Sequence, residues 1–215
     1  MADVLAQLKA GIRRFQTNVY PQNVDTYVRA VNEPQRPLAL FVACADSRID
    51  PVEITQSDPG SLFVLRNIGN VIPAYGEMMG GVSAVVEYAV SALKVKHVVV
   101  CGHTECGAMA ALMQPDLMDE MPAVRNWMTN AAAALSVTKS LAKAEDRTAE
   151  FARRLTEENV LLQIQHLRTH PSVAGAMARE ELTISGWVYD IGAGGVRISE
   201  DGGRIFHPVQ ADSKL

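Results

Sequence analysis

Short apolar runs alternate with segments of helical periodicity along the first half of the chain. Continuous apolar runs at 37–43, 61–67 and 96–103 predict buried strands. Between the second and third runs, apolar positions in 80–95 recur every three or four residues, which predicts a helix with one buried face. This alternation indicates an α/β fold, with a mostly parallel central β-sheet covered by helices on both faces.

The second half of the chain has a different pattern. Residues 119–180 have mostly helical spacing, and Pro171 interrupts it at a position that favours the start of a new helix. Two apolar segments follow, at 182–191 and 194–199, and they predict a C-terminal strand pair. Neither an internal repeat nor a linker-like composition is present, so we expect a single domain overall.

The N-terminal segment also has helical spacing, over residues 3–32, with a break at Pro21. It precedes the first predicted strand and has no strand of its own. We therefore divide the chain into an N-terminal helical arm at 1–34 and an α/β domain at 35–215, where any catalytic site is expected.

Composition and charge exclude several classes of function. The chain has 215 residues, a hydrophobic fraction of 48%, a charged fraction of 20% and a net charge of −4, which is typical of a globular protein. The absence of a dense Lys/Arg run argues against nucleic acid or an anionic membrane as a partner. The N-terminus lacks the apolar core of a signal peptide, and no stretch reaches the roughly 20 apolar residues of a membrane span. We expect a cytoplasmic protein.

The chain contains three cysteines, Cys44, Cys101 and Cys106. A small odd number argues against a disulfide framework and favours thiols that are buried, catalytic or metal-bound. Cys101 lies inside an apolar strand, where a purely structural role is the simpler interpretation.

Metal-binding residue types stand where two predicted strands end. Cys44 ends the first strand, His103 ends the third, and Cys106 follows three residues later. Ligands of parallel sheets bind at the carboxyl ends of the strands, so the three side chains would converge if these strands are neighbours. Two thiolates and one imidazole favour zinc, and three protein ligands leave the open position of a catalytic site. The alternative is that both cysteines are small buried apolar residues and His103 is a satisfied loop residue.

Asp46 and Arg48 follow the first cysteine and can form a charge-assisted pair. Beside a metal, Asp46 could orient a zinc-bound hydroxide, or it could become a fourth ligand in a closed state. Arg48 would hold the carboxylate away from the metal and keep it ionised. Without a metal nearby, the pair would be an ordinary surface ion pair that contributes little.

These residues resemble the paired motifs of the β-class carbonic anhydrases, Cys-x-Asp-x-Arg and His-x-x-Cys. The similarity extends over roughly 35–191 and includes further family motifs in the same order. It looks most like bacterial members found beside cyanate metabolism, and it also resembles the plant and cyanobacterial enzymes of the plant-like, open subgroup. The matching segments are CADSR (44–48), LFVLRNIGNVIP (62–73), GGVSAVVEYAV (80–90), HTECG (103–107), EMPAV (120–124), RTHPSV (168–173) and GWVYDI (186–191).

The resemblance implies zinc-dependent, reversible hydration of carbon dioxide to bicarbonate and a proton. It implies that the substrate is a small molecule and that the chain forms a homodimer or a higher even-numbered homo-oligomer. The implied metal ligands are Cys44, His103 and Cys106, and the implied catalytic dyad is Asp46 and Arg48.

The plant-like subgroup implies three substrate-binding residues. Gln35, nine positions before Cys44, matches a glutamine that hydrogen-bonds the substrate. Phe63 and Tyr88 match pocket aromatics, and the tyrosine usually reaches across a dimer interface. Phe41 stands where the bicarbonate-gated subgroup has tryptophan, which favours the open subgroup.

Other functions compete with this interpretation. The same site could hydrolyse another linear substrate, such as carbonyl sulfide or carbon disulfide. A non-catalytic zinc-holding or thiol-sensing module would keep the metal but would not need both Asp46 and Arg48. Nucleotide binding is disfavoured because no phosphate-binding loop is present. His166 and His170 have metal-like spacing but lack the glutamate of the His-Glu-x-x-His motif, so we do not expect them to bind a metal.

Overall fold

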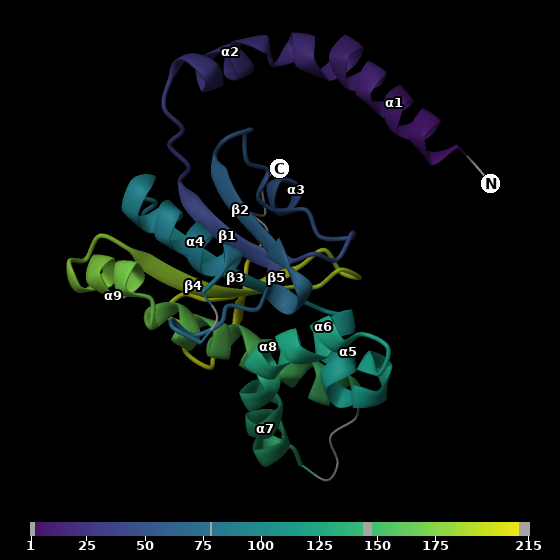
Figure 1. Ribbon diagram of the computed structural model, residues 1–215, viewed down its shortest axis with the longest axis vertical. Coiled ribbons are helices and arrows are strands. Elements are labelled where there is room, and N and C mark those ends of the chain that lie inside the picture. Colours follow the sequence, from purple (N-terminus) through teal and green to yellow (C-terminus); the bar gives the residue numbers. More distant parts are fainter. Residues whose placement is uncertain (1–2, 78, 144–147, 211–215) are drawn as a thin grey trace.

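A six-stranded sheet forms the centre of the computed structural model, which describes residues 3–77, 79–143 and 148–210 (Figure 1). The strand order is β2-β1-β3-β4-β5-β6. The first four strands in that order run parallel, and β5 and β6 are antiparallel additions at one edge. The strands are β1 (Ala39–Cys44), β2 (Leu62–Asn67), β3 (His97–His103), β4 (Thr183–Tyr189), β5 (Val196–Ser199) and β6 (His207–Pro208).

The predicted mostly parallel sheet is confirmed, with two additions. The predicted C-terminal strand pair corresponds to β4 and β5, which pair with each other. Strand β4 also pairs in parallel with β3 and so belongs to the main sheet. The very short β6 was not predicted, because two residues without an apolar pattern leave no periodicity to detect.

The N-terminal residues form helices that stand away from the sheet (Figure 1). Helix α1 (Val4–Arg14) continues into a π-helical turn, η1 (Phe15–Val19), and a 3-10 turn, η2 (Tyr20–Gln22), precedes α2 (Val24–Asn32). Pro21 lies within the 3-10 turn, which confirms the predicted break. The Asp3 carboxylate caps α1 by accepting a hydrogen bond from the Ala6 N–H at 3.0 Å. Neither α1 nor α2 has a buried residue.

The remaining helices cover the sheet unevenly. On one face, apolar residues of α4, α8 and α9 pack against those of β1, β3 and β4 in one core cluster. The opposite face is covered by the short α3 and by side chains such as Trp187, whose ring meets Phe41 edge to face at 5.6 Å. The helices are α3 (Pro51–Thr55), α4 (Gly81–Glu87) with its π-helical continuation η4 (Tyr88–Ala92), α5 (Gly107–Met113), α6 (Pro122–Met128), α7 (Ala132–Leu141), α8 (Thr148–Arg168) and α9 (Pro171–Ala178), with 3-10 turns η3 (Ile68–Asn70), η5 (Pro115–Met118) and η6 (Thr129–Ala131).

Helix α8 lies directly on the sheet because two strands present glycine to it. A Cβ added at Gly102 of β3 would lie 2.9 Å from methyl groups of Thr156 and Val160, and one at Gly186 of β4 would lie 2.7 Å from Val160. These approaches are possible only without a side chain on the strands. The position of α8 relative to the carboxyl half of the sheet is therefore fixed.

Among the helices of the described residues, none combines the length and apolar character that crossing a membrane requires.

Candidate metal centre

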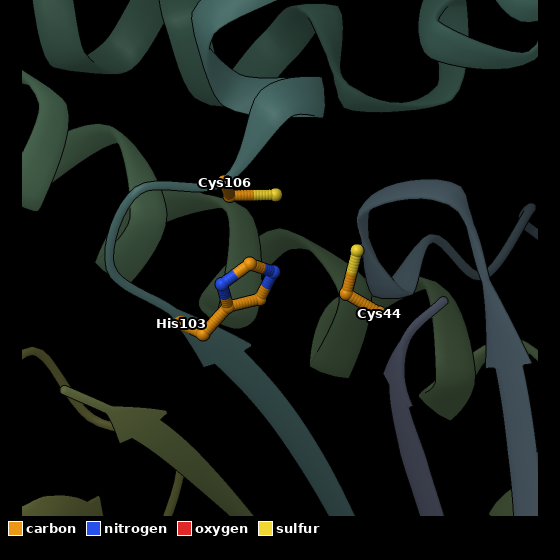
Figure 2. Close-up of side chains that lie close together, drawn as sticks. All are labelled: Cys44, His103 and Cys106. Carbon is orange, nitrogen blue, oxygen red and sulfur yellow. The ribbon is translucent and has the colours of Figure 1, made fainter. Parts of the chain in front are cut away.

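The carboxyl ends of β1 and β3 bring Cys44 and His103 together, because these strands are parallel neighbours. Cys106 joins them after a tight turn, in which Glu105 has a left-handed φ of 56°, and it stands at the start of α5. One ligand atom from each side chain lies within 4.8 Å of the others, and the exposed fractions are 5%, 1% and 6% in chain order. Figure 2 shows the two sulfur atoms and the imidazole around one shared space. The predicted convergence is confirmed.

The imidazole of His103 is arranged to offer a lone pair to that space. Its Nδ1 lies 2.8 Å from the carbonyl oxygen of Thr104, so Nδ1–H donates and Nε2 is left as an acceptor. Nε2 is buried and has no hydrogen-bond partner among the described residues. A buried polar atom without a partner is costly and requires an explanation. A metal ion on Nε2 supplies one, since metal-binding histidines typically donate the other ring N–H to a carbonyl.

The two thiols are electrostatically linked. The Cys106 thiol donates a hydrogen bond to Cys44 and lowers the pKa of the Cys44 thiol, although burial of the sulfur opposes this shift. The same contact, together with burial, raises the pKa of Cys106. The contact therefore favours the thiolate form of Cys44, and a second thiolate beside it would need a cation to offset the repulsion. Two sulfur atoms and one imidazole nitrogen are the donor set of a soft divalent transition metal.

Asp46 and Arg48 form the predicted ion pair at the edge of this cluster. Arg48 donates from Nε to Oδ1 of Asp46 at 2.9 Å and from Nη2 to Oδ2 at 2.7 Å. These bonds hold the pKa of the Asp46 carboxyl well below its usual range. Arg48 Nη2 also donates to the carbonyl oxygen of Glu105 at 3.0 Å, which ties the dyad to the turn that carries Cys106. The Asp46 side chain is 16% exposed and that of Arg48 is 49% exposed.

Arg66 of β2 is part of this arrangement and was missed by sequence reasoning. Its Nε donates to the carbonyl oxygen of Cys44 at 3.1 Å, and its Nη2 donates to that of Asp46 at 2.6 Å. The guanidinium thus fixes the backbone on which one cysteine and the aspartate stand. The only signal in the sequence is an arginine near the end of a predicted strand, which does not identify its partners.

The three residues predicted to bind substrate lie away from the cluster of their own chain. Phe63 pairs in register with Leu40, four residues before Cys44 on β1, which is about 13 Å along the strand. The Tyr88 ring lies beside Phe63, with ring centroids 6.0 Å apart, and Tyr88 is 50% exposed. Gln35 is exposed and precedes β1, at the opposite end of that strand from Cys44. One chain therefore does not bring these residues to Cys44.

Two hollows lie near the cluster, and one of them reaches it. One, of about 480 Å³, lies between α5 and α8 and reaches the cluster through Cys106. The other, of about 390 Å³, is apolar and lies beside Ala45 and Trp127. Neither has Asp46 or Arg48 among its lining residues in the described part of the chain. Asp46 and Arg48 instead reach solvent directly, with 16% and 49% of their side chains exposed.

His166, His170 and the third cysteine make contacts that fit structural roles. His166 Nδ1 lies 2.8 Å from the carbonyl oxygen of Ile72, and His170 Nε2 lies 3.1 Å from that of Pro73. Cys101 is buried within β3, and burial raises the pKa of its thiol to about 12. Each of these side chains is accounted for without a metal.

The sequence of the chain matches a known protein family and several of its members. Residues 39–196 match the family model described as carbonic anhydrase. A carbonic anhydrase of Pseudomonas aeruginosa is 44% identical over 198 residues, covering 91% of this chain and 88% of the relative. Carbonic anhydrase 1 of Escherichia coli O157:H7 is 40% identical over 205 residues, covering 95% and 92%.

Solved structures agree with the sequence relatives. The β-carbonic anhydrase CcaA superposes with a TM-score of 0.88 at 33% identity and covers 96% of this chain and 92% of its own. A Coccomyxa β-carbonic anhydrase in complex with acetazolamide has a TM-score of 0.75 at 32% identity, covering 91% and 86%. A tetrameric β-carbonic anhydrase from Sordaria macrospora has a TM-score of 0.69 at 30% identity, covering 92% and 93%.

Proposed function

Because this chain belongs to the β-class carbonic anhydrases, which hydrate carbon dioxide reversibly to bicarbonate and a proton, we propose that its reaction takes place on a zinc ion held by Cys44, His103 and Cys106. The observation that carries the assignment of the ligands is the buried three-residue cluster, in which His103 Nε2 has no other partner among the described residues. With three protein ligands, a bound zinc would keep one position open for solvent or substrate, as in catalytic zinc sites.

Each residue near the cluster has a distinct role in this proposal. Zinc, when bound, lowers the pKa of a coordinated water and so supplies a nucleophile near neutral pH. Asp46 stays ionised because Arg48 donates to both of its oxygens, and its remaining lone pairs accept a hydrogen bond that orients the nucleophile. Arg48 also keeps the carboxylate from turning inward, and Arg66 holds the backbone between Cys44 and Asp46.

The pH dependence of hydration tests the donor set. We expect the rate of carbon dioxide hydration to rise from about pH 6 to about pH 9, because two anionic sulfur ligands offset the charge of the divalent ion and so acidify water less than neutral imidazoles do. Stopped-flow assays on protein of measured zinc content would provide this profile. A rate that is constant across the range, with zinc fully bound throughout, would contradict the two-thiolate donor set.

We further propose that two copies of the chain associate and complete each other's sites. The arm exposes apolar side chains along α1, including Leu8 at 62% and Ile12 at 56%, and an amphipathic helix of this kind requires a covering surface. The Phe63–Tyr88 pair lies far from its own Cys44 and Tyr88 is exposed, so these rings are available to a second copy. The tetrameric relative from Sordaria macrospora supports an assembly of even number.

Substitution of the arm tests this association. We expect Leu8→Asp to weaken dimer formation by roughly ten- to a hundredfold, because a charge would replace a buried leucine at the interface. Size-exclusion chromatography with light scattering, over a dilution series, measures the change. Gln7→Asp on the same helix is the matched control, since it adds a charge at an exposed polar position. Equal masses for the two variants at every concentration would argue against a role for the arm.

The proposed ligands also favour a compartment. Cys44 and Cys106 must remain reduced to bind the metal, and all three cysteines are free in the structure. A reducing environment such as the cytoplasm preserves thiols of this kind. We therefore propose a cytoplasmic enzyme.

A further inference from the structure

The loop that follows β2 contacts one of the proposed metal ligands through its backbone. The N–H of Gly69 points to the sulfur of Cys44, with nitrogen and sulfur 3.4 Å apart. Gly69 is buried and has a left-handed φ of 73°, and an added Cβ would lie 3.0 Å from the Cβ of Ala108 on α5. Only glycine combines this conformation with so close an approach to α5. The loop is therefore built to present a peptide N–H to this sulfur.

Two buried amide side chains of α8 hold that loop. Asn159 Nδ2 donates to the carbonyl oxygen of Gly69 at 3.0 Å, and Gln163 Oε1 accepts from the N–H of Ile72 at 2.8 Å. Gln163 Nε2 donates to Asn159 Oδ1 at 2.9 Å, so the two amides act as one unit. Their exposed fractions are 1% and 0%. Residues four apart on a helix lie on one face, and here that face forms hydrogen bonds with the loop at two positions.

The helix that carries these amides cannot move easily relative to the cluster. Val160, next to Asn159 in sequence, is in contact range of the positions where Gly102 and Gly186 lack a side chain. Gly102 immediately precedes His103 on β3. A continuous set of contacts thus runs from the strand that carries His103, through α8 and the loop, to the sulfur of Cys44.

We propose that Asn159, supported by Gln163, is a positioning residue for the metal centre, which it serves by holding the Gly69 N–H against the Cys44 sulfur. This inference rests on the proposed zinc site. A hydrogen bond donated to a thiolate ligand orients its lone pairs and reduces its electron donation to the metal. Buried amide groups cost free energy unless each donor and acceptor is paired. Here the two side chains form hydrogen bonds with each other and with the loop, and these bonds fix the position of the loop.

The experiment compares Asn159→Leu and Gln163→Met with Thr138→Val. Thr138 is also fully buried, but among the described residues its hydroxyl bonds within α7, to the carbonyl oxygen of Ala134, so its loss controls for a missing internal hydrogen bond. Zn²⁺ affinity is measured by competition with a chromogenic chelator, and the sulfur-to-metal charge-transfer band is recorded on the Co²⁺-loaded proteins. We expect Asn159→Leu to weaken Zn²⁺ binding about ten- to a hundredfold, because the lost positioning of the Cys44 sulfur outweighs its greater electron donation. Its Co²⁺ band should move to longer wavelength, because a thiolate without its N–H donor gives up electrons more readily.

Gln163→Met should change the Zn²⁺ affinity and the Co²⁺ band in the same direction as Asn159→Leu, but by less. If Asn159→Leu does not fold, the result for Gln163→Met tests the inference. Thr138→Val should match the wild type in Zn²⁺ affinity and in the Co²⁺ spectrum. Bands and affinities that coincide in all four proteins would overturn the inference while leaving the zinc site in place. A wild-type chain that binds neither metal would instead overturn the proposed function and this inference with it.

Discussion

Replacing Cys106 with serine is expected to lower the bound zinc content and to reduce carbon dioxide hydration by at least about a hundredfold. Loss of residues that merely orient metal ligands already costs ten- to a hundredfold in affinity or activity, and Cys106 is a proposed ligand itself. Serine keeps the size of the side chain but does not provide an anionic sulfur at neutral pH. Metal analysis of the purified protein and a stopped-flow hydration assay, both at one pH, measure the two effects.

The matched control is Cys101→Ser. Cys101 is also a buried free thiol, on β3, but its sulfur donates to the carbonyl oxygen of Gly102 at 3.4 Å, and a serine hydroxyl can make that bond as well. We expect this variant to keep its zinc and its activity per folded molecule. Loss of zinc from both variants to the same degree would show that the fold, and not the sulfur at position 106, retains the metal.

The ligand residues could be predicted because the pattern of strands locates them. Cys44 and His103 each end an apolar run, and parallel strands collect such residues at one edge. Whether β1 and β3 are neighbours could not be derived, since β2 lies between them in the sequence but pairs with the other side of β1. The resemblance to a known family supplied what the pattern left open.

Other parts of the site leave no trace in a single sequence. Asn159 and Gln163 stand in a long helical segment where two amides look like ordinary polar positions, and only the tertiary contact with the loop reveals their burial. The same holds for Arg66, whose partners are backbone carbonyls rather than residues with a recognisable motif. Side chains that bind backbone atoms of distant segments depend on the fold, so their roles follow only from coordinates.

The positions of Phe63 and Tyr88 show a different limit of prediction from the sequence. Both were predicted to bind substrate, and the structure places them together but about 13 Å along the sheet from the level of Cys44. The resemblance predicts that both rings belong to a pocket, with the tyrosine reaching across a dimer interface, and a single chain does not bring them to its own Cys44. Their contribution to catalysis, like that of Gln35, stays a prediction that depends on the second copy.

Asp46→Asn is expected to reduce the catalytic efficiency of hydration by about a hundredfold to ten-thousandfold, with zinc content unchanged. The amide is neutral, so it loses the charge-assisted bonds that Arg48 makes with both oxygens. Its NH₂ group also donates where the carboxylate would accept, so it cannot orient the nucleophile in the same way. Efficiency is measured by stopped flow on samples with matched zinc content, and retention of the full wild-type rate would rule out the proposed role.

Asp50→Asn is the control for a lost carboxylate in the same segment, because Asp50 caps α3 by accepting from the Val52 N–H at 2.9 Å. Asparagine is an equally good capping residue, so we expect this variant to retain its rate. Loss of zinc from Asp46→Asn would identify Asp46 as a fourth ligand and would indicate the closed state, against which the Phe41 position argues.

Arg48→Gln separates the position of the Asp46 carboxylate from its charge. The arginine holds the pKa of Asp46 below its usual range, so its removal raises that pKa towards the ordinary value of about 3.9. Asp46 would then still be ionised throughout an assay from about pH 7 to about pH 9. We therefore expect a deficit in rate that is the same at every pH in this range, because the carboxylate keeps its charge and loses only its fixed orientation. A deficit that disappears at high pH would instead identify protonation, and not geometry, as what Arg48 controls.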